Sequence, residues 1–237
     1  MATANAGVIS CDVIKFQTKL IFYAASPGLG LGSELGVFDS DTAEYVVLEK
    51  FPDKIIAQIS FSETGFPSSS QTGFSSIKDP KLLYVTIPDS NIPYQIGELW
   101  VADIEIEAVH QSDFKIAHHN TQFLAEIDGG HGYAAKWSPD NAAIAFIQRE
   151  NPDDINADHI ASALHSNIYL VDITSKQISQ LTDFEATLVY DIAWSPQGDS
   201  LAFTANDSIW VSHLNGEYAR HTDAAVIARH PVWLSSP

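Results

Sequence analysis

The sequence predicts an all-β fold built from about four repeated four-stranded units, and three observations support this prediction. Aromatic residues make up 11% of the 237-residue chain, and such residues favour strands over helices. A tryptophan-serine-proline motif recurs along the chain, and so does a short apolar segment that ends in a polar residue. Repeats of this size and strand content predict a β-propeller of four-stranded antiparallel blades, here a single domain over residues 1–237.

The tryptophan motif marks the first hairpin of each predicted blade. Trp137–Asn141 reads Trp-Ser-Pro-Asp-Asn, and Trp194–Gly198 reads Trp-Ser-Pro-Gln-Gly. The residues after each proline favour a tight turn, and a short apolar strand follows each motif. Trp233–Pro237 is a degenerate copy and Phe61–Gly65 a weaker one. The 39 residues from Trp194 to Trp233 are close to the length of one blade.

The second pattern places the third strand of each blade. In each copy an apolar segment ends in a polar residue, which predicts a strand that ends in a turn. The four copies are Leu35–Asp39, Leu99–Asp103, Ile168–Asp172 and Ile209–His213.

The two ends of the chain suggest how the ring closes. The chain begins with material for the second to fourth strands of a blade but shows no clear first strand, whereas residues 228–233 have the pattern of a first strand. We therefore expect the C-terminal strand to pair with the N-terminal blade, which removes an exposed sheet edge. A piece of a larger propeller is the alternative.

Two insertions, at 66–80 and 150–165, connect the second and third strands of successive blades. Long loops on a rigid framework commonly carry recognition, although loops also tolerate neutral drift. We expect both loops to emerge on one face and to bind a protein partner. The candidate binding residues are Phe66, Phe74, Asp153, Asp154 and Asp158.

Charge and hydropathy narrow the range of partners. The formal net charge is −18, which disfavours nucleic acid and anionic membrane surfaces and favours a basic partner. No apolar run is long enough to enter a membrane as a spanning helix. The N-terminus does not resemble a signal peptide, and Cys11 alone defines no redox compartment. We expect a cytoplasmic protein, or a periplasmic or extracellular one if a leader has been removed.

The sequence shows no catalytic motif. A serine hydrolase of the α/β type needs Gly-x-Ser-x-Gly, and the chain has no such string. The glycines of Gly28–Gly32 do not open a helix, so we interpret this segment as a hairpin loop and not as a phosphate-binding loop. These observations predict a non-catalytic protein with no cofactor.

The alternative to a protein without a bound metal is one that binds calcium. Asp154, Asn156 and Asp158 place oxygen ligands at alternate positions, as calcium loops do. His159 and His165 occupy the positions where such a loop needs glycine and glutamate, so we expect a solvated acidic loop instead. The weaker metal candidates are Asp154, Asn156, Asp158, His131 and His165.

Trp137–Asn141, the strand Ile144–Phe146 and Ile168–Asp172 together resemble the propeller repeat of the TolB-like (WD40-like) family. The same repeat occurs in propellers of prolyl oligopeptidase-like and tricorn-like peptidases and of oligogalacturonate lyase. The resemblance is strong over residues 132–237 and weaker over 13–128. It implies structural roles for the repeat tryptophans, which pack between blades.

This resemblance implies three kinds of function. TolB-like propellers bind proteins on one face, peptidase propellers filter substrates, and the lyase uses metal and basic residues in its central opening. We expect a non-catalytic scaffold. The alternatives are a lyase- or hydrolase-like site in the central opening, or a truncated gating propeller of a larger peptidase.

Overall fold

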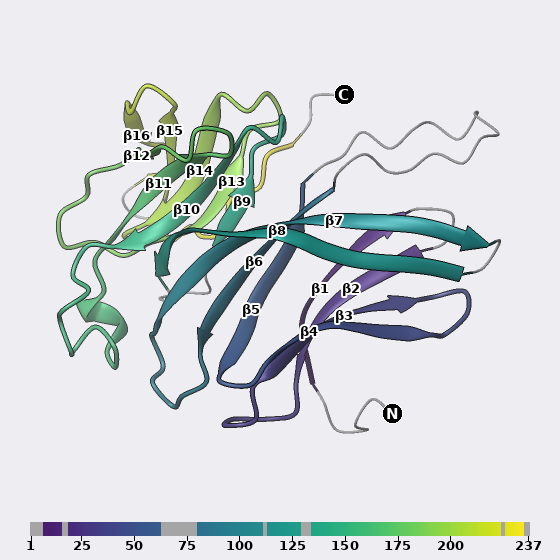
Figure 1. Cartoon of the computed structure of the whole chain (residues 1–237). Helices are drawn as coiled ribbons and strands as arrows, with labels where there is room; N and C mark the ends of the chain where they lie inside the picture. The colour runs from purple at the N-terminus through teal and green to yellow at the C-terminus, as the bar shows by residue number, and fades with distance from the viewer. Residues whose placement is uncertain are drawn as a thin grey trace. The chain divides into compact units, whose positions relative to one another are not determined.

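The computed structural model describes residues 7–15, 19–62, 80–110, 113–128, 134–223 and 226–234. This part of the chain is almost entirely β-structure, with one short 3-10 helix at Ala161–Ala163. The strands form four sheets of four antiparallel strands each (Figure 1). In every sheet the strands follow one another in chain order, as in propeller blades. The predicted all-β propeller fold is therefore confirmed.

The first two sheets come from the N-terminal half of the chain. The first consists of β1 (Gly7–Lys15), β2 (Lys19–Ser26), β3 (Ser33–Asp39) and β4 (Tyr45–Phe51). The second consists of β5 (Lys54–Phe61), β6 (Lys81–Pro88), β7 (Ile96–His110) and β8 (Asp113–Asp128).

The other two sheets come from the C-terminal half. The third consists of β9 (Ala135–Trp137), β10 (Ala143–Arg149), β11 (Ser166–Asp172) and β12 (Ile178–Gln180). The fourth consists of β13 (Val189–Trp194), β14 (Ser200–Ala205), β15 (Ser208–His213) and β16 (Tyr218–Arg220). Among the described residues, no helix is long and apolar enough to cross a membrane.

The chain divides into two compact units. The first unit is Met1–Asn91 with Glu98–Ala125, and the second is Ile92–Gly97 with Glu126–Pro237. Each unit has a core of alternating buried strand residues, as expected for sheets that bury a face. Phe22 and Leu82 lie in the core of the first unit and Phe203 in that of the second. The single domain over residues 1–237 stays a prediction.

Both Trp-Ser-Pro motifs form the predicted hairpins. The Ser138 amide donates to the Ala143 carbonyl over 2.8 Å, and the Ser138 hydroxyl accepts from the Ala143 amide over 2.9 Å. Ser195 repeats this pattern in the fourth sheet. Asn141 and Gly198 occupy the equivalent left-handed position, with φ of 59° and 73°. Asparagine and glycine are the residues that adopt this conformation most readily, which explains why the motif ends in one or the other.

The tryptophans of the motif connect successive repeats. The Trp194 indole N–H donates to the Lys136 carbonyl over 3.0 Å, and the Trp233 indole N–H donates to the Ala193 carbonyl over the same distance. Each acceptor immediately precedes the tryptophan of the repeat before it, Trp137 in the first case and Trp194 in the second. This repeated contact agrees with a structural role for the tryptophans.

The predicted turn after the third strand is correct at three places and wrong at Asp103. Strands β3, β11 and β15 end at the predicted polar residues, but β7 continues past Asp103 to His110. The Asp103 carboxylate pairs with Lys81 of β6 and accepts a hydrogen bond from Asn120 of β8. These cross-strand contacts let the ladder continue through a polar residue.

The predicted closing strand is also wrong. Gly7–Lys15 forms β1, the first strand of the N-terminal sheet, so that sheet already has four strands. Residues 228–233 are not a strand, Val232 is 81% exposed, and Trp233 is bonded to Ala193 of the fourth sheet. The sequence hid β1 because the Trp-Ser-Pro motif that marks the ends of β9 and β13 is missing there.

Replacing Trp194 tests the contact between repeats. Trp194→Ala removes a half-buried ring and its hydrogen bond, so we expect a loss of about 3 kcal/mol in the free energy of unfolding, measured by urea denaturation. Trp194→Phe keeps most of the ring and loses only the donor, which should cost about 1 kcal/mol. Equal midpoints for wild type and Trp194→Ala would contradict a structural role.

Candidate functional site

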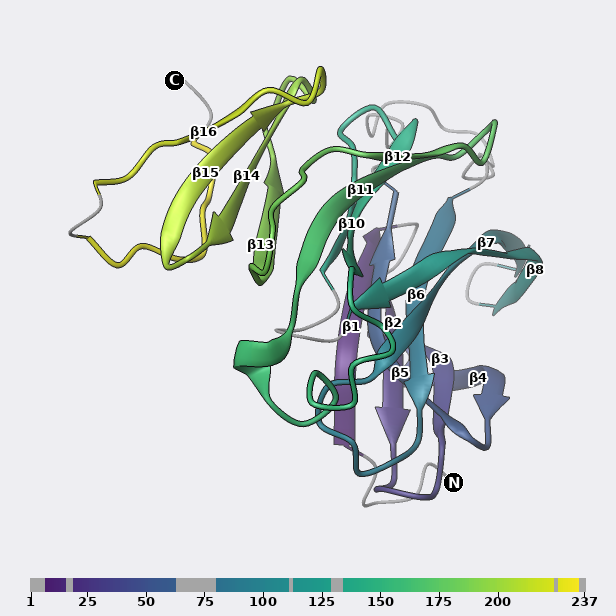
Figure 2. The same cartoon turned by 90° about the vertical axis from the view of Figure 1, so that its left-hand side faces the viewer.

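The second predicted insertion is an ordered loop of the second unit. Residues 150–165 join β10 to β11 with the predicted boundaries and contain the 3-10 helix. Figure 2 shows this loop extending beyond the ends of the two strands. The other insertion, with Phe66 and Phe74, lies outside the described residues, apart from Pro80 at its end. The strands on either side of it are β5 and β6, the first and second of their sheet, so the prediction that it connects a second strand to a third is wrong, because Phe61 ends a first strand and Leu82 belongs to the second. Its part in binding stays a prediction.

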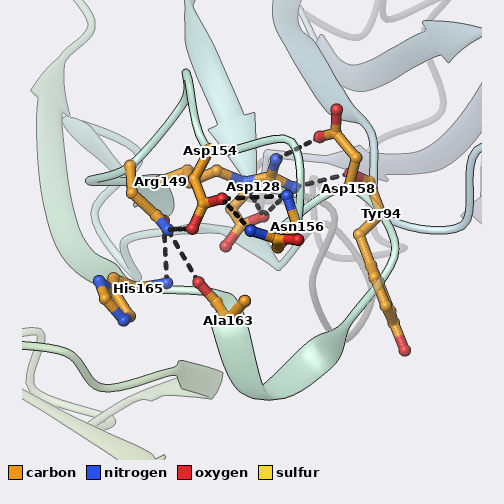
Figure 3. Close-up of polar contacts among 9 residues, drawn as sticks. Tyr94, Asp128, Arg149, Asp154, Asn156, Asp158, Ala163 and His165 are labelled. Carbon is orange, nitrogen blue, oxygen red and sulfur yellow. Dashed lines mark hydrogen bonds and ion pairs between the residues drawn. The ribbon is translucent and has the colours of Figure 1, made fainter.

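A buried arginine holds the base of this loop (Figure 3). The Arg149 side chain is 1% exposed and pairs with the equally buried Asp128 over 3.2 Å. It also donates to the Asp158 carboxylate over 2.8 Å and to the Tyr94 carbonyl over 2.8 Å. A buried guanidinium is tolerated only when such partners compensate for its lost hydration. Asp158, predicted to bind a partner, is thus a structural ligand of Arg149.

Asn151 closes the stem of the loop. Its amide nitrogen donates to the Ala163 carbonyl over 2.8 Å, and its amide oxygen accepts from the His165 backbone N–H over 3.1 Å. Asp154 accepts two hydrogen bonds from Asn156, both at 3.0 Å. Local side-chain bonds of this kind replace the missing strand ladder and hold the loop in one conformation.

The apolar residues of the loop differ in their exposure to solvent. Ala157 and Leu164 are buried, whereas Ile155 is 72% and Ile160 51% exposed. Asp153, in the same loop, is also exposed. Sequence reasoning chose the acidic residues and missed both isoleucines. The sequence did contain a signal for an exposed aliphatic residue, because Ile155 lies between Asp154 and Asn156 in a segment without strand periodicity.

The geometry does not build a calcium site from the predicted ligands. Asp158 lies against the Arg149 guanidinium, which repels a cation, and Asp154 is bonded to Asn156. In the described ranges, no group of three or more histidine, cysteine, aspartate or glutamate side chains could hold a metal ion. His131 lies outside those ranges, and the backbone N–H of His165 closes the loop stem.

A cavity of about 700 Å³ lies in the second unit, and the 3-10 helix of the loop forms part of its wall. This volume is within the range of small-molecule sites. The cavity is lined by Ala161, Ser162, Leu164, Ala186, Thr187, Leu188, Tyr190, Asp191, Asn206, Asp207, Arg229 and His230.

An ion pair and a histidine–carboxylate contact lie in the cavity wall. Arg229 pairs with Asp207 over 2.6 Å, and this contact raises the pKa of Arg229. The Tyr190 hydroxyl lies 3.4 Å from the same carboxylate, and burial raises the pKa of Tyr190. His230 Nδ1 lies 2.9 Å from Asp191 Oδ2. None of these residues was singled out from the sequence, because the wall joins segments that are distant along the chain.

Residues with positive φ gather around the cavity. Nine non-glycine residues of the described chain have positive φ, and five of them line this cavity. Asn206 and Asp207 are the two turn residues of the β14–β15 hairpin, where asparagine and aspartate favour positive φ, whereas Ala186 adopts it at a steric cost. The five residues are Ala186, Asp191, Asn206, Asp207 and His230.

The glycine-rich segment Gly28–Gly32 is the β2–β3 hairpin loop, as predicted. The amides of Gly30 and Gly32 donate to the two oxygens of the Asp89 carboxylate over 2.8 and 2.7 Å, which lowers the pKa of Asp89. A side chain at Gly32 would lie 2.2 Å from the Phe51 carbonyl oxygen. The amides that could have bound phosphate are therefore occupied by the protein itself.

Comparison with known proteins adds evidence on the fold. No protein-family model matches the chain, and no curated protein sequence matches it either. One of two prolyl endopeptidases with solved structures is 12% identical to the chain with a TM-score of 0.51, covering 91% of this chain and 29% of its own. TolB from Acinetobacter baumannii is 12% identical with a TM-score of 0.42, covering 90% of this chain and 57% of its own.

Oligogalacturonate lyase in complex with manganese is 13% identical, with a TM-score of 0.32. It covers 89% of this chain and 62% of its own. The chain thus spans less than two thirds of each of these three proteins. Only the endopeptidase match, whose TM-score exceeds 0.5, bears on the fold. It agrees with the four blade-like sheets. The chain therefore has the fold of a β-propeller, with four-stranded antiparallel blades.

Replacing Arg149 tests the anchor of the loop. Arg149→Met leaves the buried Asp128 carboxylate without its cation, so we expect the free energy of unfolding to fall by about 3–5 kcal/mol. Asp158→Asn breaks only the half-exposed pair and should cost about 1 kcal/mol. Urea denaturation measures both values. Similar losses for the two variants would contradict the assignment of Arg149 as the anchor.

Proposed function

We propose that this chain is a non-catalytic recognition scaffold that binds a protein partner through loop 150–165. The observation that carries the proposal is the exposure of Ile155 and Ile160 on a loop held by the buried Arg149. Two exposed aliphatic residues on one anchored loop offer a partner apolar contact area at a fixed position.

Because the loop is already anchored, a partner that binds it loses little conformational entropy of the loop. A mobile loop loses conformational entropy when a partner orders it, at about 0.5–1.5 kcal/mol for each immobilised side chain. Asn151 and Arg149 already hold this loop in one conformation. Burial of Ile155 and Ile160 by a partner would contribute about 1.5–3 kcal/mol for each side chain that becomes fully covered.

Charge indicates the kind of partner. Asp153 is exposed on the same loop as the two isoleucines, and the chain carries a formal charge of −18. A strongly acidic protein attracts basic surfaces during diffusional encounter and repels acidic ones. A partner that combines an apolar contact with a basic rim fits this loop best. The absence of a Gly-x-Ser-x-Gly string from the whole sequence supports a non-catalytic role.

The test compares two matched double variants. Proteins crosslinked to the wild-type chain in an extract of its source are identified, and the purified partner is then titrated by calorimetry. We expect Ile155→Ser with Ile160→Ser to weaken binding about 100-fold, because both anchors are lost. Ile178→Ser with Leu214→Ser changes two other exposed aliphatic residues of the second unit and should leave affinity within two-fold.

Equal affinity of wild type and the Ile155/Ile160 variant would contradict this binding surface. Turnover of a substrate by the purified chain would contradict the non-catalytic role.

A further inference from the structure

The cavity of the second unit contains a carboxylate whose hydrogen-bonding capacity is not used. Oδ2 of Asp191 is buried, and within the described part of the chain it accepts no hydrogen bond. His230 Nδ1 lies 2.9 Å from it without hydrogen-bond alignment, and the pair is ionic only when the imidazole is protonated. A buried carboxylate oxygen without a donor is costly, so it favours a ligand that supplies one.

The contact with His230 is easily displaced. The His230 side chain is 77% exposed, whereas that of Asp191 is 23% exposed. An ion pair with so exposed a partner contributes little to stability, because water solvates the imidazole almost as well. A stronger cation that enters the cavity can therefore replace His230 at this oxygen.

The other charged groups of the cavity leave one carboxylate that can attract a cation. Asp207 is neutralised by Arg229, which leaves Asp191 as the attractive site for a cation. A metal ion does not suit the position, because the described residues contain no group of three or more metal-ligating side chains. Thr187, Asn206 and Ser162 line the wall and offer hydrogen bonds to the uncharged part of a ligand.

We propose that this cavity binds an organic amine, with the ammonium group donating to Asp191 Oδ2. This inference goes beyond the proposed function, because a small ligand can enter the cavity whether or not loop 150–165 binds a protein. The ammonium group supplies three donors and a full positive charge, and the volume of about 700 Å³ accommodates the rest of the molecule. The amine can be a free metabolite or the side chain of a lysine in a peptide.

Calorimetry with two amine probes tests this site. The probes are 1,5-diaminopentane and the capped peptide acetyl-Ala-Lys-Ala-amide, and the uncharged controls are the diamine acetylated at both nitrogens and the peptide acetylated at the lysine nitrogen. We expect at least one amine to bind the wild-type chain and its acetylated form not to bind. Binding of the diamine alone indicates a free amine as the ligand, and binding of the peptide indicates a lysine side chain.

Variants then locate the amine. Asp191→Asn keeps a residue that tolerates positive φ and removes only the charge, so we expect it to weaken binding roughly ten- to hundred-fold. Glu126→Gln removes the same charge from an exposed position of the second unit, outside the cavity lining, and should leave affinity unchanged. His230→Ala removes the competing group and should bind at least as tightly as wild type.

Three results would overturn the proposal. They are no binding of either amine at millimolar concentration, equal binding of the acetylated probes, or equal affinity in wild type and Asp191→Asn. None of these results depends on Ile155 or Ile160, so this proposal and the protein-recognition proposal fail separately.

Discussion

The buried ion pairs of Arg149 are the interaction on which the second unit depends most. Arg149 is the last residue of β10, and it connects that strand to Asp128 at the end of β8, to Asp158 in the loop and to the Tyr94 carbonyl. A charge this deeply buried cannot leave its partners without a large cost, so the loop has to follow the strand. The position of Ile155 and Ile160 and one wall of the cavity follow from that constraint.

Local sequence patterns predicted the repeated parts of the fold. The Trp-Ser-Pro hairpins, the third strands and the limits of loop 150–165 depend on residues that are close in sequence, and all were recognisable. β1 was missed because it lacks the tryptophan, and the length of β7 was missed because Asp103 looks like a turn residue. Its partners, Lys81 and Asn120, are distant in sequence and could not be paired with it beforehand.

The candidate site was only partly predictable for the same reason. The acidic loop could be located, but the role of Asp158 depends on Arg149, and the wall of the cavity combines loop, strand and C-terminal residues. Asp191 and His230 are 39 residues apart and gave no motif. In both the loop and the cavity wall, polar contacts fix irregular segments at the ends of regular strands.

The central claim is that loop 150–165 is held in one conformation before any partner binds. Hydrogen exchange of the backbone amides in the free protein measures this most directly. The amides of Ala157, Ile160 and His165 each donate a hydrogen bond within the loop. The account predicts that these three amides exchange about as slowly as those of β10 and β11. Exchange as fast as in an unstructured peptide would contradict it.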